Sequence, residues 1–142
     1  MKSIIICILC FYGLSAYAKP VEDTLPVTIP AQFTDDYGIR YSITDTLWIQ
    51  HPSARYHIIR WNYKEQYIIV RNDENNPSEK GLYSRIDYMK FTGMEPYLWG
   101  FCLTTYNAAT DVLAENSPNK ADRKNPRKGC NGYPFSRMKL LE

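Results

Sequence analysis

The chain has 142 residues, a length that favours one domain over two. Its composition, with 44% hydrophobic and 23% charged residues, is that of a globular protein and excludes a wholly disordered chain. The formal net charge of +2 is too small to predict a nucleic-acid partner, and none is expected.

The first 18 residues have the features of a signal peptide. Lys2 supplies a positive charge, Ile4–Leu14 form an apolar run, and Ala16-Tyr17-Ala18 offers the small residues of a cleavage site. We therefore expect cleavage near Ala18 and a secreted or periplasmic protein. No later segment has the run of about 18 apolar residues that a membrane-spanning helix needs, so no such helix is expected in the mature chain.

Cleavage would remove Cys7 and Cys10 and leave Cys102 and Cys130 as a pair. In an exported chain this pair is expected to form a disulfide, and two buried free thiols are the alternative. The loop that it closes spans 29 residues, counting both ends. A metal site is not predicted, because the spacing matches no zinc motif and the chain has only two histidines. No cofactor is predicted either.

Residues 19–30 carry three prolines and little periodicity, and we expect them to form an extended leader. A single disulfide-linked β domain is expected over residues 31–142. Runs rich in β-branched and aromatic residues predict five or six strands, at Ala31–Thr34, Arg40–Ile49, Tyr56–Trp61, Gln66–Arg71, Leu82–Phe91 and Tyr97–Tyr106. Short turns between them indicate an antiparallel meander in a mainly β protein. The pattern fits both a closed, barrel-like sheet and a covered sheet.

One short helix is expected after the strands. Asn107 is the predicted N-cap of a helix over Ala108–Glu115, and Ser117-Pro118 would end it. Val112 and Leu113 are expected to face the sheet.

Alternation along Tyr97–Tyr106 predicts which side chains enter the core. Cys102 is expected on the face opposite the core. The core-facing row is expected to be Tyr97, Trp99, Phe101 and Leu103.

Four fragments stand out by their order along the chain: Gly81–Tyr88, Trp99–Cys102, Ala121–Pro126 and Gly129–Ser136. Their combination resembles a group of small exported bacterial proteins of unknown function, with a Ser-Arg-x-Asp-aromatic strand, an aromatic-Cys strand and a Gly-Cys-x-Gly-aromatic ending. The resemblance covers about residues 33–140, although this chain has Tyr88 where the group usually has Trp. It implies that the two cysteines belong to one compact unit, and it supplies no catalytic residues.

The C-terminal residues 119–142 hold seven basic and two acidic residues, a net charge of +5. Such a cluster beside Tyr133 and Phe135 could meet an anionic surface, a polysaccharide or a protein as partner. A solvated loop that charge keeps soluble is the alternative. The candidate anion-binding residues are Arg85, Arg123, Lys124, Arg127, Lys128 and Arg137.

Arg85 and Asp87 lie two residues apart and hence on one strand face. With Arg123 or Arg71 nearby, they could clamp a carboxylate or a phosphate. Alternatively, they form a structural ion pair that pins the C-terminal segment to the sheet. The second interpretation is favoured, because the five donors of Arg suit a strand residue that holds an irregular segment.

No phosphate-binding Gly-Lys-Ser/Thr loop, His-Glu-x-x-His zinc motif or Gly-x-Ser-x-Gly elbow occurs, and no catalytic residue is assigned. The predicted function is therefore a non-enzymatic binding or interaction module at the cell envelope or outside the cell. The alternative is a small secreted hydrolase of the phosphodiesterase kind. It would use His57 as acid or base, with Glu65 and Arg71.

Overall fold

The computed structural model describes residues 25, 27 and 29–141, so the predicted signal peptide and most of the predicted leader lie outside the described residues. The described part contains eight strands and one short helix. In chain order they are β1 (Ala31–Asp35), β2 (Arg40–Ile43), β3 (Leu47–Gln50), β4 (Ala54–Asn62), β5 (Tyr67–Asn72), β6 (Tyr83–Lys90), β7 (Trp99–Ala108), α1 (Asp111–Glu115) and β8 (Ser136–Leu140).

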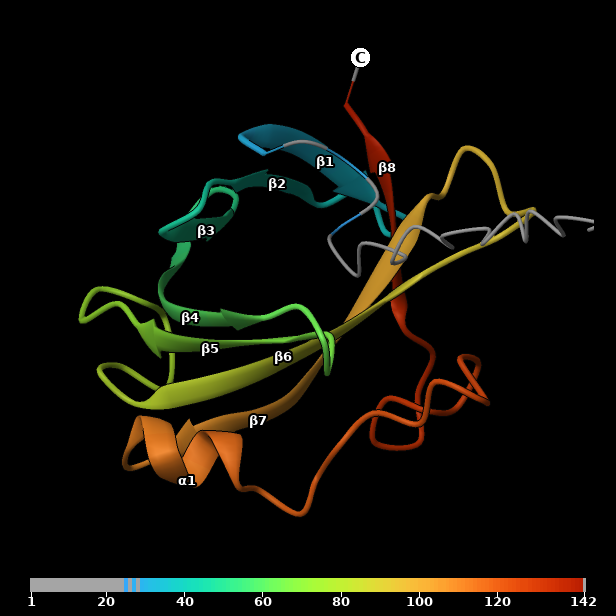
Figure 1. The fold of residues 1–142 in the computed structure, drawn as a ribbon. Helices are drawn as coiled ribbons and strands as arrows, with labels where there is room; N and C mark the ends of the chain where they lie inside the picture. The colour runs from blue at the N-terminus through green and yellow to red at the C-terminus, as the bar shows by residue number, and fades with distance from the viewer. Residues whose placement is uncertain (1–24, 26, 28, 142) are drawn as a thin grey trace, which may run out of the picture.

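Each strand pairs antiparallel with the next, and β8 returns to pair with β1, which closes the sheet into a barrel (Figure 1). The predicted mainly β class, antiparallel meander and short helix are confirmed. Of the two architectures that the sequence left open, the protein adopts the barrel. It has eight strands rather than five or six.

One additional strand comes from the segment Arg40–Ile49, which was predicted as a single strand. It is a hairpin of β2 and β3, because Thr44 turns the chain. The Oγ1 atom of Thr44 accepts hydrogen bonds from the backbone N–H groups of Thr46 (3.3 Å) and Leu47 (3.0 Å). A Thr side chain that satisfies nearby N–H groups competes with the strand ladder and favours a turn.

The other additional strand, β8, lies in the C-terminal segment, for which no strand was predicted. It fits between β7 and β1, with Trp99 opposite Met138 and Phe33 opposite Leu140. Only its central side chain, Met138, is fully buried. A segment with so few inward apolar residues has only weak hydrophobic alternation, so the sequence does not predict a strand there. Pairing with β7 and β1 stabilises its extended conformation.

The helix is shorter than predicted. Strand β7 continues to Ala108, so the helix begins at Asp111 and Thr110, not Asn107, is its N-cap. The Oγ1 atom of Thr110 accepts a hydrogen bond from the backbone N–H of Leu113 at 3.2 Å. The predicted inward residues Val112 and Leu113 are exposed, and Ala114 is the helix residue that packs on the sheet.

Large apolar side chains fill the interior of the barrel. Trp99 packs edge-to-face against Trp48 and Phe33, with ring centroids 6.0 and 5.3 Å apart. Phe101 and Leu103 pack against the same core, as predicted, whereas Tyr97 precedes β7 and contacts Arg137 instead. The fully or almost fully buried residues of this core are Leu25, Phe33, Tyr41, Ile43, Trp48, Ile68, Val70, Ile86, Tyr88, Trp99 and Met138. Barrels of eight strands are just wide enough for such filling.

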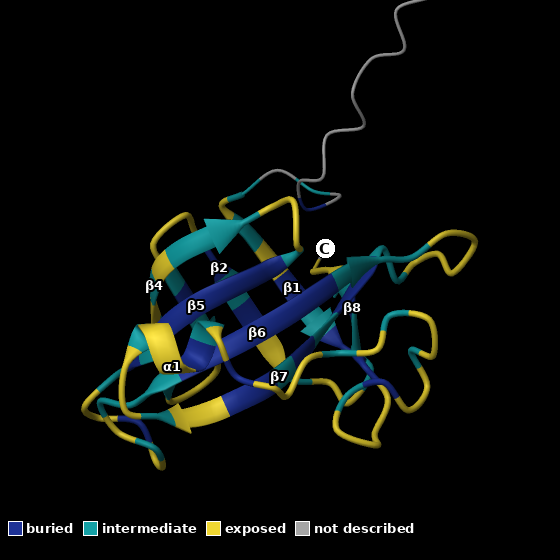
Figure 2. Ribbon diagram, turned by 60° about the horizontal axis from the view of Figure 1, so that its bottom comes forward, coloured by how far each residue is buried: buried dark blue, intermediate teal, exposed yellow. Residues whose placement is uncertain are grey.

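The outer faces of β5, β6 and β7 are also covered, by α1 and by the chain that follows it (Figures 1 and 2). Cys102 lies on this outer side of β7 and forms the predicted disulfide with Cys130, with the two Cα atoms 5.4 Å apart. Within the described part of the chain, no helix is long and apolar enough to cross a membrane.

Replacing both Cys102 and Cys130 by Ala should lower the free energy of unfolding by about 3–4 kcal/mol. The disulfide links two positions 28 residues apart, and without it the unfolded chain gains conformational entropy. Urea unfolding of the oxidised wild type and the double variant measures the difference. Reduced wild type serves as the control and should match the variant. Equal stability of all three forms would contradict this role of the disulfide.

Candidate functional site

Residues 119–135, here called the basic loop, run along the outside of β6 and β7 from α1 toward β8 (Figure 1). The loop folds back on itself, and the N–H of Asp122 donates to the carbonyl of Gly129 at 2.8 Å. A Cβ atom at Gly129 would lie 1.9 Å from the carbonyl oxygen of Asp122, so only glycine fits there. The loop is therefore a defined structure and not a loose connection.

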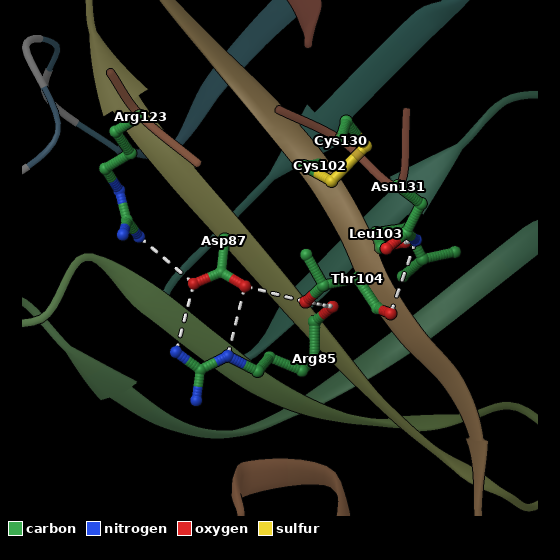
Figure 3. The surroundings of a disulfide bond; sticks show 8 residues. All are labelled: Arg85, Asp87, Cys102, Leu103, Thr104, Arg123, Cys130 and Asn131. Carbon is green, nitrogen blue, oxygen red and sulfur yellow. Dashed lines mark hydrogen bonds and ion pairs between the residues drawn. A yellow bond between two sulfur atoms is a disulfide. The ribbon is translucent and has the colours of Figure 1, made fainter. Parts of the chain in front are cut away.

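The buried carboxylate of Asp87 anchors the loop to the barrel (Figure 3). Asp87 has no exposed surface, and its two oxygens accept four hydrogen bonds. Two come from Arg85, at 3.1 and 3.0 Å, and one from the hydroxyl of Thr104 at 2.6 Å. The fourth comes from Arg123 of the basic loop at 3.1 Å. Charge-assisted bonds of this kind offset the cost of burying the carboxylate.

Arg123 extends this anchor to the backbone of β6 and of the β4–β5 turn. Its guanidinium donates to the carbonyl oxygens of Tyr88 (2.9 Å) and Gln66 (2.7 Å) as well as to Asp87. Two of the six candidate anion-binding residues, Arg85 and Arg123, thus already have an anion, which is the side chain of Asp87. The arrangement is the ion pair that pins the C-terminal segment to the sheet.

Arg85 also holds the helix against the barrel. Its Nη1 atom donates to the backbone oxygen of Glu115 at 2.9 Å, and its guanidinium lies 3.8 Å from the ring centroid of Tyr67. The carboxylate of Glu115 accepts from the hydroxyl of Tyr67 at 2.6 Å and pairs with Arg60 at 2.9 Å. The hydrogen bond from Tyr67 is the main cause that lowers the pKa of Glu115. One network therefore joins the barrel wall, α1 and the basic loop.

The remaining charges of the basic loop face the solvent. Lys124, Arg127 and Lys128, all predicted candidates, are exposed, as is Lys120. No ion pair links any of these four cations to another residue of the described chain. Asp122 is the acidic residue of the loop, and its Oδ1 atom accepts the backbone N–H of Lys124. The exposed part of the loop is therefore strongly positive.

A groove of about 530 Å³ lies beside the basic loop. It is bounded by the β1–β2 turn, the β6–β7 turn, the end of the loop and β8. Its apolar lining consists of Tyr37, Phe91, Met94, Pro126, Pro134 and Phe135. Its charged lining consists of Asp36, Arg127 and Arg137.

Arg137, the last candidate, is paired within this groove. Its Nε atom donates to Asp36 at 2.8 Å, and its guanidinium lies 4.8 Å from the ring centroid of Tyr97. The hydrogen bond to Asp36 raises the pKa of Arg137. Arg127 is thus the charged residue of the groove that lacks an ion-pair partner among the described residues.

Two backbone contacts shape the floor of the groove. A Cβ atom at Gly100 would lie 2.6 Å from the ring of Phe91, so glycine at this position lets that ring approach the backbone of β7 closely. The N–H of Phe135 donates to the carbonyl of Pro126 at 2.9 Å, which holds the end of the loop against its middle.

The apolar groove residues were not identified from the sequence as site residues. Tyr37 and Met94 lie in two of the short turns that were expected between the predicted strands. An aromatic residue in a predicted turn indicates an exposed apolar side chain, which can mark a binding surface. Tyr37 is such a residue and is 71% exposed. Strand β8 brings the two turns together, because Met138 lies opposite both Asp35, at the end of β1, and Trp99, at the start of β7.

The residues of the hydrolase alternative do not all come together. His57 lies opposite Arg71 in the β4–β5 ladder, and its Nε2 atom donates to Asp73 at 2.7 Å. Glu65 lies in the turn beyond the far end of β4. The strand residues between His57 and that turn span about 16 Å at the usual rise per residue. Asp73, which was not predicted, is the carboxylate beside His57.

His51 lies in an exposed turn and hydrogen-bonds to the hydroxyl of Ser42 at 2.8 Å. Within the described residues, no group of three or more His, Cys, Asp or Glu side chains could hold a metal ion.

No family model, curated protein or solved structure matches the chain.

Replacing Asp87 by Asn should lower the free energy of unfolding by about 3–5 kcal/mol, because it leaves buried Arg85 without its carboxylate. Asp45→Asn, at an exposed position, is the matched control and should change it by less than about 0.5 kcal/mol. Urea unfolding measures both. A difference of less than about 1 kcal/mol between the two variants would contradict the anchoring role.

The hydrogen bond from His57, followed by that from the N–H of Asn75, lowers the pKa of Asp73 to about 2. Because the folded-state value lies below the ordinary 3.8, this group stabilises the fold above about pH 4 and loses that contribution as the pH falls toward 2. In His57→Ala the pKa of Asp73 should rise but stay below 3.8, since the N–H of Asn75 remains. Carboxyl-carbon NMR titration measures it. Lys64→Ala, in the distant β4–β5 turn, is the control and should leave the pKa of Asp73 unchanged. If the pKa of Asp73 also stays unchanged in His57→Ala, the assigned effect of His57 is refuted.

Proposed function

We propose that the protein is an exported, non-enzymatic binding module that engages an acidic polysaccharide through the basic loop. The observation that carries the proposal is the set of four exposed cations, Lys120, Lys124, Arg127 and Lys128, without ion-pair partners in the described chain. They stand on a loop that is fixed by a disulfide and by Asp87. A fixed loop loses little conformational entropy when it binds.

The chemistry of these cations favours a polysaccharide over a protein partner. Three of the four are lysines, and lysine is depleted in protein–protein interfaces because its compact ammonium group is strongly hydrated. A hydrated polyanion leaves much of that hydration in place. Tyr133, which is 74% exposed on the same loop, adds an aromatic surface.

Export is part of the proposal. It is supported by the signal-peptide features of residues 1–18, by the resemblance to small exported proteins, and by the disulfide, since disulfides persist in oxidising compartments. The hydrolase alternative would need Glu65 near His57. The distance between them along β4 favours the binding function.

The variant Lys124→Gln/Lys128→Gln should bind polygalacturonate and dextran sulfate about 2- to 30-fold more weakly than wild type, as expected for the loss of two exposed charge pairs. Isothermal titration calorimetry measures the affinity. Wild-type binding should also weaken between about 20 and 300 mM salt, because salt screens exposed charges.

Lys64→Gln/Lys80→Gln removes the same charge from two exposed positions outside the loop and is the matched control. Neutral dextran should not bind. The proposal fails if the control weakens binding as much as the loop variant, or if binding is insensitive to salt. Tighter, salt-dependent binding to poly-L-glutamate than to either polysaccharide would identify a protein partner instead.

A further inference from the structure

The groove beside the basic loop has the size of a site for a small molecule. Its volume of about 530 Å³ lies within the range of roughly 300–1,000 Å³ that is common for ligand sites. Many eight-stranded barrels hold a ligand in their interior. Here Trp48, Trp99 and the other core side chains occupy that interior, so a ligand has to bind on the outside, where this groove is one of several concave surfaces.

Most of the lining is apolar. Phe91, Met94 and Pro134 face the groove together with the rings of Tyr37 and Phe135. Two of these, Tyr37 and Met94, are exposed, at 71% and 37%. Covering exposed apolar surface is favourable, so a ligand with an apolar body would be stabilised here. A hydrated polysaccharide chain would gain little from such a lining.

The charges of the groove add up to one unpaired cation. Asp36 neutralises Arg137 through hydrogen bonds to both its side chain and its backbone N–H. Arg127 faces the groove without an ion-pair partner in the described chain. A guanidinium binds carboxylate, sulfonate or phosphate oxygens with two parallel donors. The groove therefore complements a ligand that carries one negative charge.

We propose that this groove binds a small amphipathic organic anion, with its apolar body on the wall formed by Tyr37, Phe91 and Met94 and its anionic group on Arg127. The site uses none of the three lysines of the polysaccharide proposal, although the two proposals share Arg127. It also accounts for the apolar lining, which polysaccharide binding leaves unused.

The probe for the test is 1-anilinonaphthalene-8-sulfonate, which has an aromatic body and a single sulfonate. Its fluorescence is titrated with the full mature chain. We expect saturable binding at one site, displaced by decanoate and only weakly by decanol, since decanol has the apolar chain without the charge. Near-UV circular dichroism must show the native fold, because this probe also binds partly unfolded proteins.

Arg127→Gln should weaken binding of the probe roughly tenfold or more, through loss of a charge-assisted hydrogen bond. Lys128→Gln removes the same charge from the neighbouring position, which does not line the groove, and should change the affinity less than about twofold. Tyr37→Ser should also weaken binding. Its side chain is mostly exposed, so the fold should not depend on it.

Three results would overturn the proposal: no binding to the natively folded protein, equal binding by Arg127→Gln and wild type, or equal displacement by decanol and decanoate. Lys124→Gln/Lys128→Gln should bind the probe like wild type. A failure of the groove proposal is therefore distinguishable from a failure of the polysaccharide proposal.

Discussion

The carboxylate of Asp87 lies where the barrel wall, the helix and the basic loop meet. Fully removed from solvent, it would be costly to bury alone, and its four donors come from β6, β7 and the loop. Each partner thus depends on the others. Arg85 is buried because Asp87 neutralises it, and the same Arg85 then caps the end of α1 through the carbonyl of Glu115.

This anchor bears on closure of the barrel as well as on the loop. Strand β8 follows the loop directly and must reach the gap between β7 and β1. Phe33 and Leu140 face each other there from opposite ends of the described chain. Contacts between such distant residues have a large entropic cost of loop closure. Arg123 and the disulfide at Cys130 fix the chain at intermediate points, so that each loop to be closed is shorter.

The two proposed binding surfaces depend on the same rigid loop. Its outward lysines form one surface. Pro126, in the middle of the loop, and Phe135, at its end, line the groove together. Gly129 is essential to both, since the backbone of Asp122 lies where any side chain would stand. A loop held in this way presents its charges in one arrangement, which favours selectivity over nonspecific attraction.

The sequence by itself determined the class of the protein, the disulfide and most of the strands, because alternation, turn residues and a lone cysteine pair are local signals. It also predicted that Arg85 and Asp87 share a strand face, since the two-residue period requires it. It did not predict β8, whose few inward side chains become a strand only between β7 and β1, or the start of the helix, which β7 displaced by pairing with β6 as far as Ala108. The groove was decided by tertiary structure alone. Tyr37, Met94 and Arg127 are far apart in the chain. They meet because β8 pairs with both the end of β1 and the start of β7, which brings the β1–β2 and β6–β7 turns next to the basic loop that precedes β8.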